Sequence, residues 1–280
     1  MRNRPTIVFV QLERGLIMRT AFVLLPLLLG STPLAASRAT DPSPEEIQKI
    51  IRTFAENETA FALARENYTY RQTVRLQEYD EAGAPHGKFE LVSDIIFSPE
   101  GKRTERIVRA PVPTLRLIQM SPEDEQDLRN IMPFVLTNKE IDNYHVRYLG
   151  RETLDELSTY VFAVRPKTMV PGQRYFAGLI WVDDRDLMIV KTYGRSLGIL
   201  KKGTEQQFPK FETYREQIDG KYWFPTYTVA NSTLHFSNSH PRVRMTVRYE
   251  DYKQFKSDVK IMVVNPVDAP AQPAPSPPKP

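Results

Sequence analysis

The chain has 280 residues, of which 41% are hydrophobic and 26% are charged, a composition typical of a globular protein that folds without disulfide or metal support. It contains no cysteine, which excludes disulfide frameworks, cysteine-ligated metal sites, thiol nucleophiles and the lipidated cysteine of a bacterial lipoprotein. Residues 1–37 hold four of the 38 basic residues and one of the 34 acidic residues, so the remainder carries only +1 and nucleic acid is not expected as a partner.

The two ends of the chain differ in composition from its middle. Residues 19–39 run from a basic start through the short apolar stretch 21–30 to small residues, which is the order of a secretory signal. This stretch is too short for a membrane span and contains Pro26, so we expect a cleavable signal peptide over residues 1–37, with Met18 as an alternative start. Residues 265–280 contain seven prolines and predict a disordered tail, which leaves residues 38–264 as the folded domain.

The folded domain begins with the pattern of an amphipathic helix. Ser43 stands at the N-cap position, Pro44 in the first turn and Glu46 at the third helical position. Apolar residues then recur at helical spacing as far as Phe61, so we expect a helix of about five turns that ends near Asn67.

From residue 68 onward the apolar period changes from 3.6 to 2, which predicts strands. Ten segments show strand patterns, at residues 68–76, 89–97, 102–108, 144–148, 160–164, 175–182, 187–193, 211–218, 222–229 and 243–249. Between them, Ser121 and Pro122 open a second, short helix with Leu128, Ile131 and Met132 as its apolar stripe. Because short turns and not helical crossovers join the strands, we expect an α+β fold: a curved antiparallel sheet that forms an open half-barrel covered by a few helices.

Several motifs suggest chemistry, and each has a structural alternative. Gly194, Ser196 and Gly198 match the G-x-S-x-G pattern of a serine hydrolase after a predicted strand, but no helix pattern follows, so a glycine-bearing loop between strands is the stronger interpretation. The acidic cluster at 183–186 lacks the spaced ligands of a calcium loop and favours a hairpin turn. His235 and His240 have no third ligand nearby and are expected to be a solvated pair, so we predict neither a metal nor a cofactor.

The aromatic and aliphatic residues at alternate strand positions are the remaining candidates for a site. A concave sheet with few helices has more apolar inner face than two helices fill, and such half-closed barrels bind apolar ligands, although a solid core explains the same pattern. The predicted lining of an apolar cavity consists of Tyr68, Tyr70, Val74, Leu76, Phe89, Leu91, Ile95, Phe97, Leu115, Leu117, Phe162 and Phe176.

From residue 149 onward the order of motifs resembles a known family. The motifs are Leu149–Glu152, Tyr160–Lys167, Tyr175–Asp183, Asp186–Lys191 and Gly220–Pro225. With the signal peptide and the first helix, they are similar to the LolA/LolB-like outer-membrane lipoprotein-sorting superfamily of the bacterial periplasm. The resemblance implies an unclosed antiparallel barrel with lid helices, an apolar cavity for acyl chains, and an arginine that contacts the lid, for which Arg71, Arg75, Arg103 and Arg106 are candidates.

The resemblance and the residues together predict an exported, unlipidated, monomeric carrier or binder of lipoprotein acyl chains or other lipids, which works in the periplasm and is not an enzyme. Its partners are then the acyl chains and membrane-associated donor and acceptor proteins. The alternative is a periplasmic protein-interaction or sensor domain of the same fold whose core is filled by its own side chains. A serine hydrolase that uses Ser196 is a more remote alternative.

Overall fold

The computed structural model describes residues 41–98, 101–120, 122–129, 134–198, 209–235 and 239–254. The predicted signal peptide at 1–37, the alternative start at Met18, the apolar positions Ile131 and Met132, and the predicted tail at 265–280 lie outside the described residues.

The long helix α1 spans Pro44–Ala64 and begins with the capping box that the sequence predicts. The Ser43 hydroxyl accepts a hydrogen bond from the Glu46 amide, and the Glu46 carboxylate accepts one from the Ser43 amide. A short 3₁₀ turn, η1 (Arg65–Asn67), follows and leads directly into the first strand. The change of apolar period near residue 68 therefore marks the boundary between helix and sheet.

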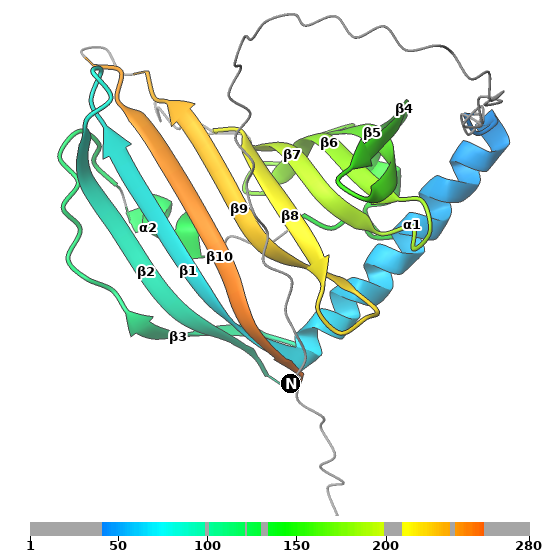
Figure 1. Cartoon of the computed structure of the whole chain (residues 1–280), viewed down its shortest axis with the longest axis horizontal. Coiled ribbons are helices and arrows are strands. Elements are labelled where there is room, and N and C mark those ends of the chain that lie inside the picture. Colours follow the sequence, from blue (N-terminus) through cyan, green and yellow to red (C-terminus); the bar gives the residue numbers. More distant parts are fainter. Residues whose placement is uncertain are drawn as a thin grey trace, which may run out of the picture. The chain divides into compact units, whose positions relative to one another are not determined.

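The strands form one ten-stranded antiparallel sheet in the described part of the chain, in the order β3-β2-β1-β10-β9-β8-β7-β6-β5-β4 (Figure 1). Its members are β1 (Tyr68–Tyr79), β2 (Pro85–Phe97), β3 (Arg103–Arg109), β4 (Tyr144–Leu154), β5 (Leu157–Pro166), β6 (Tyr175–Asp183), β7 (Ile189–Leu197), β8 (Phe211–Gln217), β9 (Trp223–Thr233) and β10 (Arg242–Gln254). The sheet is curved and does not close, because β3 and β4 are its two edges. The predicted fold class is confirmed.

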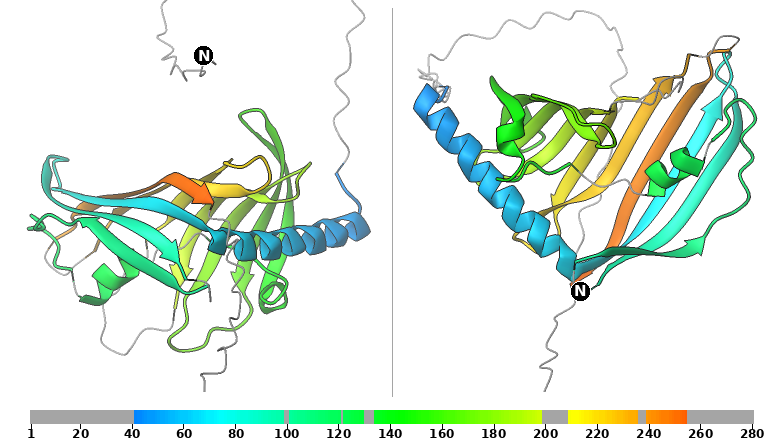
Figure 2. Two further views of the ribbon diagram at one scale, coloured as in Figure 1. Left: turned by 90° about the horizontal axis from the view of Figure 1, so that it is seen from below. Right: turned by 180° about the vertical axis from the view of Figure 1, so that it is seen from behind.

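Two different covers lie on the inner face of this sheet. The helix α1 crosses it at the β4–β8 end, while the short helix α2 (Pro122–Arg129) lies over β1, β2 and β10 on the same side (Figure 2). A 3₁₀ turn, η2 (Ile141–Asn143), then leads into β4. None of the helices in the described residues is long and apolar enough to cross a membrane.

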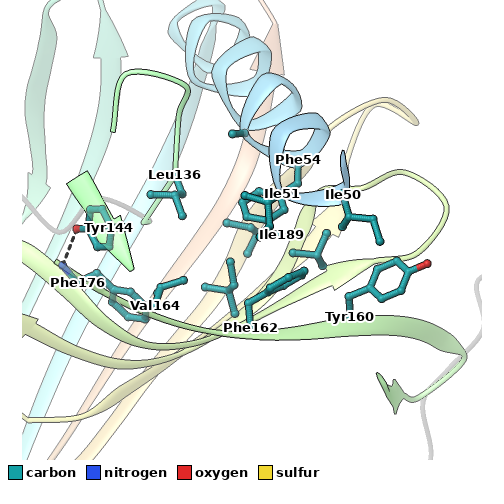
Figure 3. Packing of buried hydrophobic residues seen from close by; sticks show 13 residues of the cluster. Ile50, Ile51, Phe54, Leu136, Tyr144, Tyr160, Phe162, Val164, Phe176 and Ile189 are labelled. Atoms are coloured by element: carbon teal, nitrogen blue, oxygen red, sulfur yellow. Dashed lines mark hydrogen bonds between the residues drawn. The ribbon is translucent and has the colours of Figure 1, made fainter. Parts of the chain in front are cut away.

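The part of the inner face under α1 is a solid core. Ile50, Ile51 and Phe54 project from the helix onto Phe162 and Ile189 of the sheet (Figure 3), and Phe54, Phe162 and Ile189 have no solvent-exposed surface. The rings of Phe54 and Phe162 lie 5.5 Å apart. This end of the sheet is therefore closed by dense apolar packing, and a candidate binding site has to be sought elsewhere on the inner face.

Candidate functional site

The inner faces of β1, β2 and β10 carry a second group of apolar side chains. Register places Val74 of β1 opposite both Leu91 of β2 and Val247 of β10, so their side chains form one row across three strands. We call this group the inner apolar face; it comprises buried Val74, Phe89, Leu91, Val247 and Tyr249, with partly buried Tyr70, Leu76, Met245 and Tyr252 around them.

A thin segment covers the inner apolar face. We call residues 110–120 together with α2 the cover segment; its apolar contacts with the face come from Leu115, Met120 and Leu128, each of which remains partly exposed. The α2 sequence PEDEQDLR is strongly polar, and Leu128 is its described apolar contact with the face. Far fewer apolar side chains therefore hold this cover on the sheet than hold α1.

The carboxylate of Glu78 is the main polar anchor of the cover segment. Glu78 lies on β1 with no exposed surface. Its Oε1 accepts hydrogen bonds from the amides of Gly87 (3.0 Å) and Arg116 (2.6 Å), and its Oε2 accepts from the amides of Leu117 (2.9 Å) and Ile118 (3.1 Å). A buried carboxylate needs hydrogen-bond donors, and three of the four donors to Glu78 are backbone amides of the cover segment. This one side chain of β1 therefore binds three successive residues of the segment.

Gly87 of β2 allows the cover segment to approach the sheet closely. A Cβ atom at this position would lie 2.0 Å from the Thr114 carbonyl oxygen and 2.5 Å from the Leu115 Cα, both atoms of the cover segment backbone. The same contact includes a hydrogen bond of 2.9 Å from the Thr114 amide to the Lys88 carbonyl. Only glycine fits here without displacement of the segment.

The predicted cavity residues do not line one common cavity but are spread over several parts of the fold. Tyr70, Val74, Leu76, Phe89 and Leu91 belong to the inner apolar face, with Leu115 packed on them from the cover segment. Tyr68 packs with Phe61 and Phe224, and Phe97 lines the gap described in the next paragraph. Ile95 is buried on β2, and Leu117 is half-buried in the cover segment. Phe162 and Phe176 lie in the core under α1, away from the others.

A small gap adjoins the inner apolar face beside the end of α1. We call it the aromatic gap; its lining consists of Phe61, Arg65, Tyr70, Phe97, Phe224, Pro225 and Tyr252. Its volume of about 20 Å³ has room for about one water molecule. Tyr70 and Tyr252 belong to both the gap and the rim of the inner apolar face, so the two are continuous.

Beside the gap, α1 and β8 are joined by a buried ion pair that sequence analysis missed. Arg215 Nη1 lies 3.0 Å from Glu58 Oε1, which also accepts a hydrogen bond from the Ile189 amide, and Arg215 Nη2 donates to the Phe134 carbonyl. Burial raises the pKa of the Glu58 carboxyl, and the Arg215 guanidinium opposes that shift. The sequence does contain a signal for this ion pair, because Glu58 lies on the apolar stripe of the first helix, between Phe54 and Phe61.

Among the four candidate arginines for a lid contact, the structure separates Arg103 from the rest. Arg103 Nη2 donates to the Arg129 carbonyl at the end of α2 (2.8 Å) and to Gln72 Oε1 (3.2 Å). Arg71 and Arg106 instead pair with Asp94 on the outer face, and Arg75 pairs with Glu90. Arg103 is thus the one of the four that contacts the cover segment in the described structure.

Gly194 and Ser196 of the G-x-S-x-G motif lie inside strand β7 and Gly198 directly follows it, whereas the sequence predicts a loop for the whole motif. Ser196 pairs with Phe176 of β6, and Gly194 pairs with Gly178 where the two backbones approach too closely for a Cβ atom. No hydrogen bond joins Ser196 to a histidine within the described ranges. A nucleophile elbow needs its serine on a sharp strand-to-helix turn, which this extended strand does not provide.

The acidic cluster and the histidine pair have structural explanations. Asp183 Oδ2 accepts hydrogen bonds from the amides of Arg185 (3.0 Å) and Asp186 (2.8 Å), which confirms the predicted hairpin turn. His235 and His240 are exposed, with ring centroids 5.2 Å apart, on either side of the undescribed residues 236–238. In the described part of the chain, no three histidine, aspartate or glutamate side chains come together as metal ligands.

No protein-family model matches the sequence, and no curated protein does. Solved structures do match. A DUF1329 family protein from Desulfovibrio piger is 14% identical over 79% of this chain and 95% of its own (TM-score 0.38). A LolA superfamily protein from Nitrosomonas europaea is 12% identical over 75% of this chain and 93% of its own (TM-score 0.31). An outer membrane lipoprotein-sorting protein domain from Vibrio parahaemolyticus is 12% identical over 71% and 92% (TM-score 0.31). One of these structures is named for the superfamily that the sequence motifs resemble, but every TM-score is below 0.5, so the proposed function rests on this chain's own side chains.

Proposed function

We propose that this chain is an exported, non-enzymatic carrier that binds acyl chains of lipids or lipoproteins on the inner apolar face, beneath the cover segment. The observation that carries the proposal is the contrast between the two covers of one sheet. Under α1 the core is solid, whereas over β1, β2 and β10 the described part of the cover contributes three apolar side chains, Leu115, Met120 and Leu128, and each of them is partly exposed. The signal-like residues 19–39 support a periplasmic location.

The free energies on the two sides are comparable. At about 0.8 kcal/mol per methylene, burial of a long acyl chain releases on the order of 10 kcal/mol. Full burial of three aliphatic side chains is worth at most about 9 kcal/mol, and Leu115, Met120 and Leu128 are only partly buried. An acyl chain therefore offsets the apolar contacts that the cover segment loses, while the hydrogen bonds of Glu78 and Arg103 to the segment oppose opening and favour release.

The test is native mass spectrometry of the full chain, exported by a bacterial host and purified without detergent, followed by displacement of the neutral dye N-phenyl-1-naphthylamine by 1-dodecanol. We expect a co-purified acyl lipid and displacement by dodecanol. Leu76→Asp places a charge on the rim of the inner apolar face and should weaken dodecanol binding, while Ile96→Asp on the outer face of β2 should not. Equal affinities in the two folded variants would refute the assigned surface.

A protein-interaction or sensor domain remains the second candidate, and one observation favours it. The aromatic gap holds only about 20 Å³, which is too small for an acyl chain in this conformation. The edge strands β3 and β4 then offer backbone for strand addition by a partner. A clean protein mass with no dodecanol uptake, including in a variant whose cover segment is detached, favours this second function.

A further inference from the structure

Arg65 in the aromatic gap carries hydrogen-bond donors with no acceptor. Its Nε and Nη1 atoms are buried and have no partner among the described residues. Burial lowers the pKa of the Arg65 guanidinium, and the nearby positive charge of Arg215 lowers it further. Because buried donors without an acceptor are costly, these two atoms are places where a ligand or an ordered water can bind.

The described polar groups around the gap do not supply these two atoms with an acceptor. Arg65 lies near Arg215 and near two carboxylates, Glu66 and the buried Glu58, of which Glu58 is already bound to Arg215 and to the Ile189 amide. Arg103 and Arg65 both lie near Tyr70. Arg103 Nε also lacks a partner among the described residues, as does the Nε2 of Gln72, a side chain that is 2% exposed. The region therefore presents several unused donors and a surplus of positive charge.

We propose that the aromatic gap binds the anionic head group, a carboxylate or a phosphate, of an acyl lipid whose chain lies on the inner apolar face. Arg65 is the principal ligand and Arg103 the second. This inference rests on the proposed function and adds the chemical class of the ligand. A guanidinium offers two parallel donors to either anion, and the aromatic walls receive the first carbons of the chain.

The head group and the chain have a continuous path. Tyr70 and Tyr252 line the gap and also border the inner apolar face, so an amphiphile with its head at Arg65 directs its chain toward Val74 and Leu91. The gap of about 20 Å³ is too small for the head group in the present conformation. Arg103 Nη2 donates to the Arg129 carbonyl of the cover segment, so release of that carbonyl frees a donor of Arg103 for the head group.

The test compares four ligands with one chain and different heads: dodecanoate, dodecyl phosphate, 1-dodecanol and dodecyltrimethylammonium. Binding is measured by dye displacement on the full chain after lipid removal. We expect at least tenfold tighter binding of one or both anions than of dodecanol, and weakest binding of the cation. Dodecanoate and dodecyl phosphate distinguish a fatty acid from a phosphorylated head group.

Arg65→Met removes the charge but keeps the length of the side chain, and Arg52→Met on the exposed surface of α1 is the matched control. Arg65→Met should lose the anion preference, retain dodecanol binding and melt at the same or a higher temperature than the native protein. Arg103→Met, which should reduce the preference in part, is the second variant in case Arg65→Met does not fold.

Equal affinity for dodecanol and both anions, or an unchanged preference in Arg65→Met, overturns the head-group site and leaves the carrier function standing. Absence of binding by all four ligands overturns both.

Discussion

Replacement of Glu78 by glutamine should detach the cover segment from the sheet. The carboxylate accepts four backbone hydrogen bonds, two at each oxygen, whereas a glutamine has one oxygen and turns an NH₂ group toward the other two amides. Two buried donors then lose their acceptor at about 1–3 kcal/mol each, so the free energy that closes the segment falls by about 2–6 kcal/mol. At 1.36 kcal/mol per factor of ten, the open population rises by about thirtyfold or more.

Native-state hydrogen exchange measures this opening directly. Amides of residues 114–120 should exchange at least about thirtyfold faster in Glu78→Gln, while amides of β5 under α1 keep their protection. Glu81→Gln, at an exposed position in the turn after β1, is the control. If exchange at Arg116, Leu117 and Ile118 is unchanged in a folded Glu78→Gln protein, then Glu78 is not the anchor and the cover segment is held by other contacts.

Three further predictions concern the cover segment, the buried ion pair and the outer face. Gly87→Ala should speed dye uptake, because its Cβ atom displaces the Thr114 carbonyl; an unchanged uptake rate contradicts a moving cover. Arg215→Met should cost about 3–5 kcal/mol in urea unfolding, whereas the double variant with Glu58→Leu should cost less than the sum of the single changes, and strict additivity argues against coupling. Hydrogen bonds from outer-face arginines lower the pKa of Asp94 from 3.8, so its ion pairs stabilise the fold above that pH and are lost as the pH falls. The stability difference between native protein and Asp94→Asn should therefore shrink as the pH falls below 3.8, and a difference that does not change with pH contradicts this.

The local structure of this protein could be predicted from its sequence because it depends on neighbouring residues. The capping box of Ser43 and Glu46 and the change of period near Tyr68 specify α1 and β1 without long-range information. The G-x-S-x-G motif shows the limit of this approach. Glycines at 194 and 198 suggest a loop, but Gly194 serves a close approach of β7 to Gly178 of β6, a contact that exists only in the folded sheet.

The apolar positions of the candidate site could also be predicted in part, because they too depend on residues close together in the chain. Alternation along β1 and β2 identified apolar positions such as Val74, Leu91 and Phe97, since side chains two residues apart share a face of a strand. It did not separate them from Phe162 and Phe176, because a period of 2 indicates that a side chain is buried but not which helix or loop buries it.

The sequence by itself therefore determined the helix, the strands and the apolar side of the sheet, because these follow from chain geometry over a few residues. Only the packing of the whole chain brings Glu78 to the cover segment and places Arg65 and Arg215 near the buried carboxylate of Glu58. Glu78 is far in the chain from residues 116–118, and Arg65 is far from Arg215. In the sequence, each of these charged residues looks like an ordinary surface residue. Burial and the orientation of a few donors and acceptors give these side chains their roles, and both arise only when distant segments pack together.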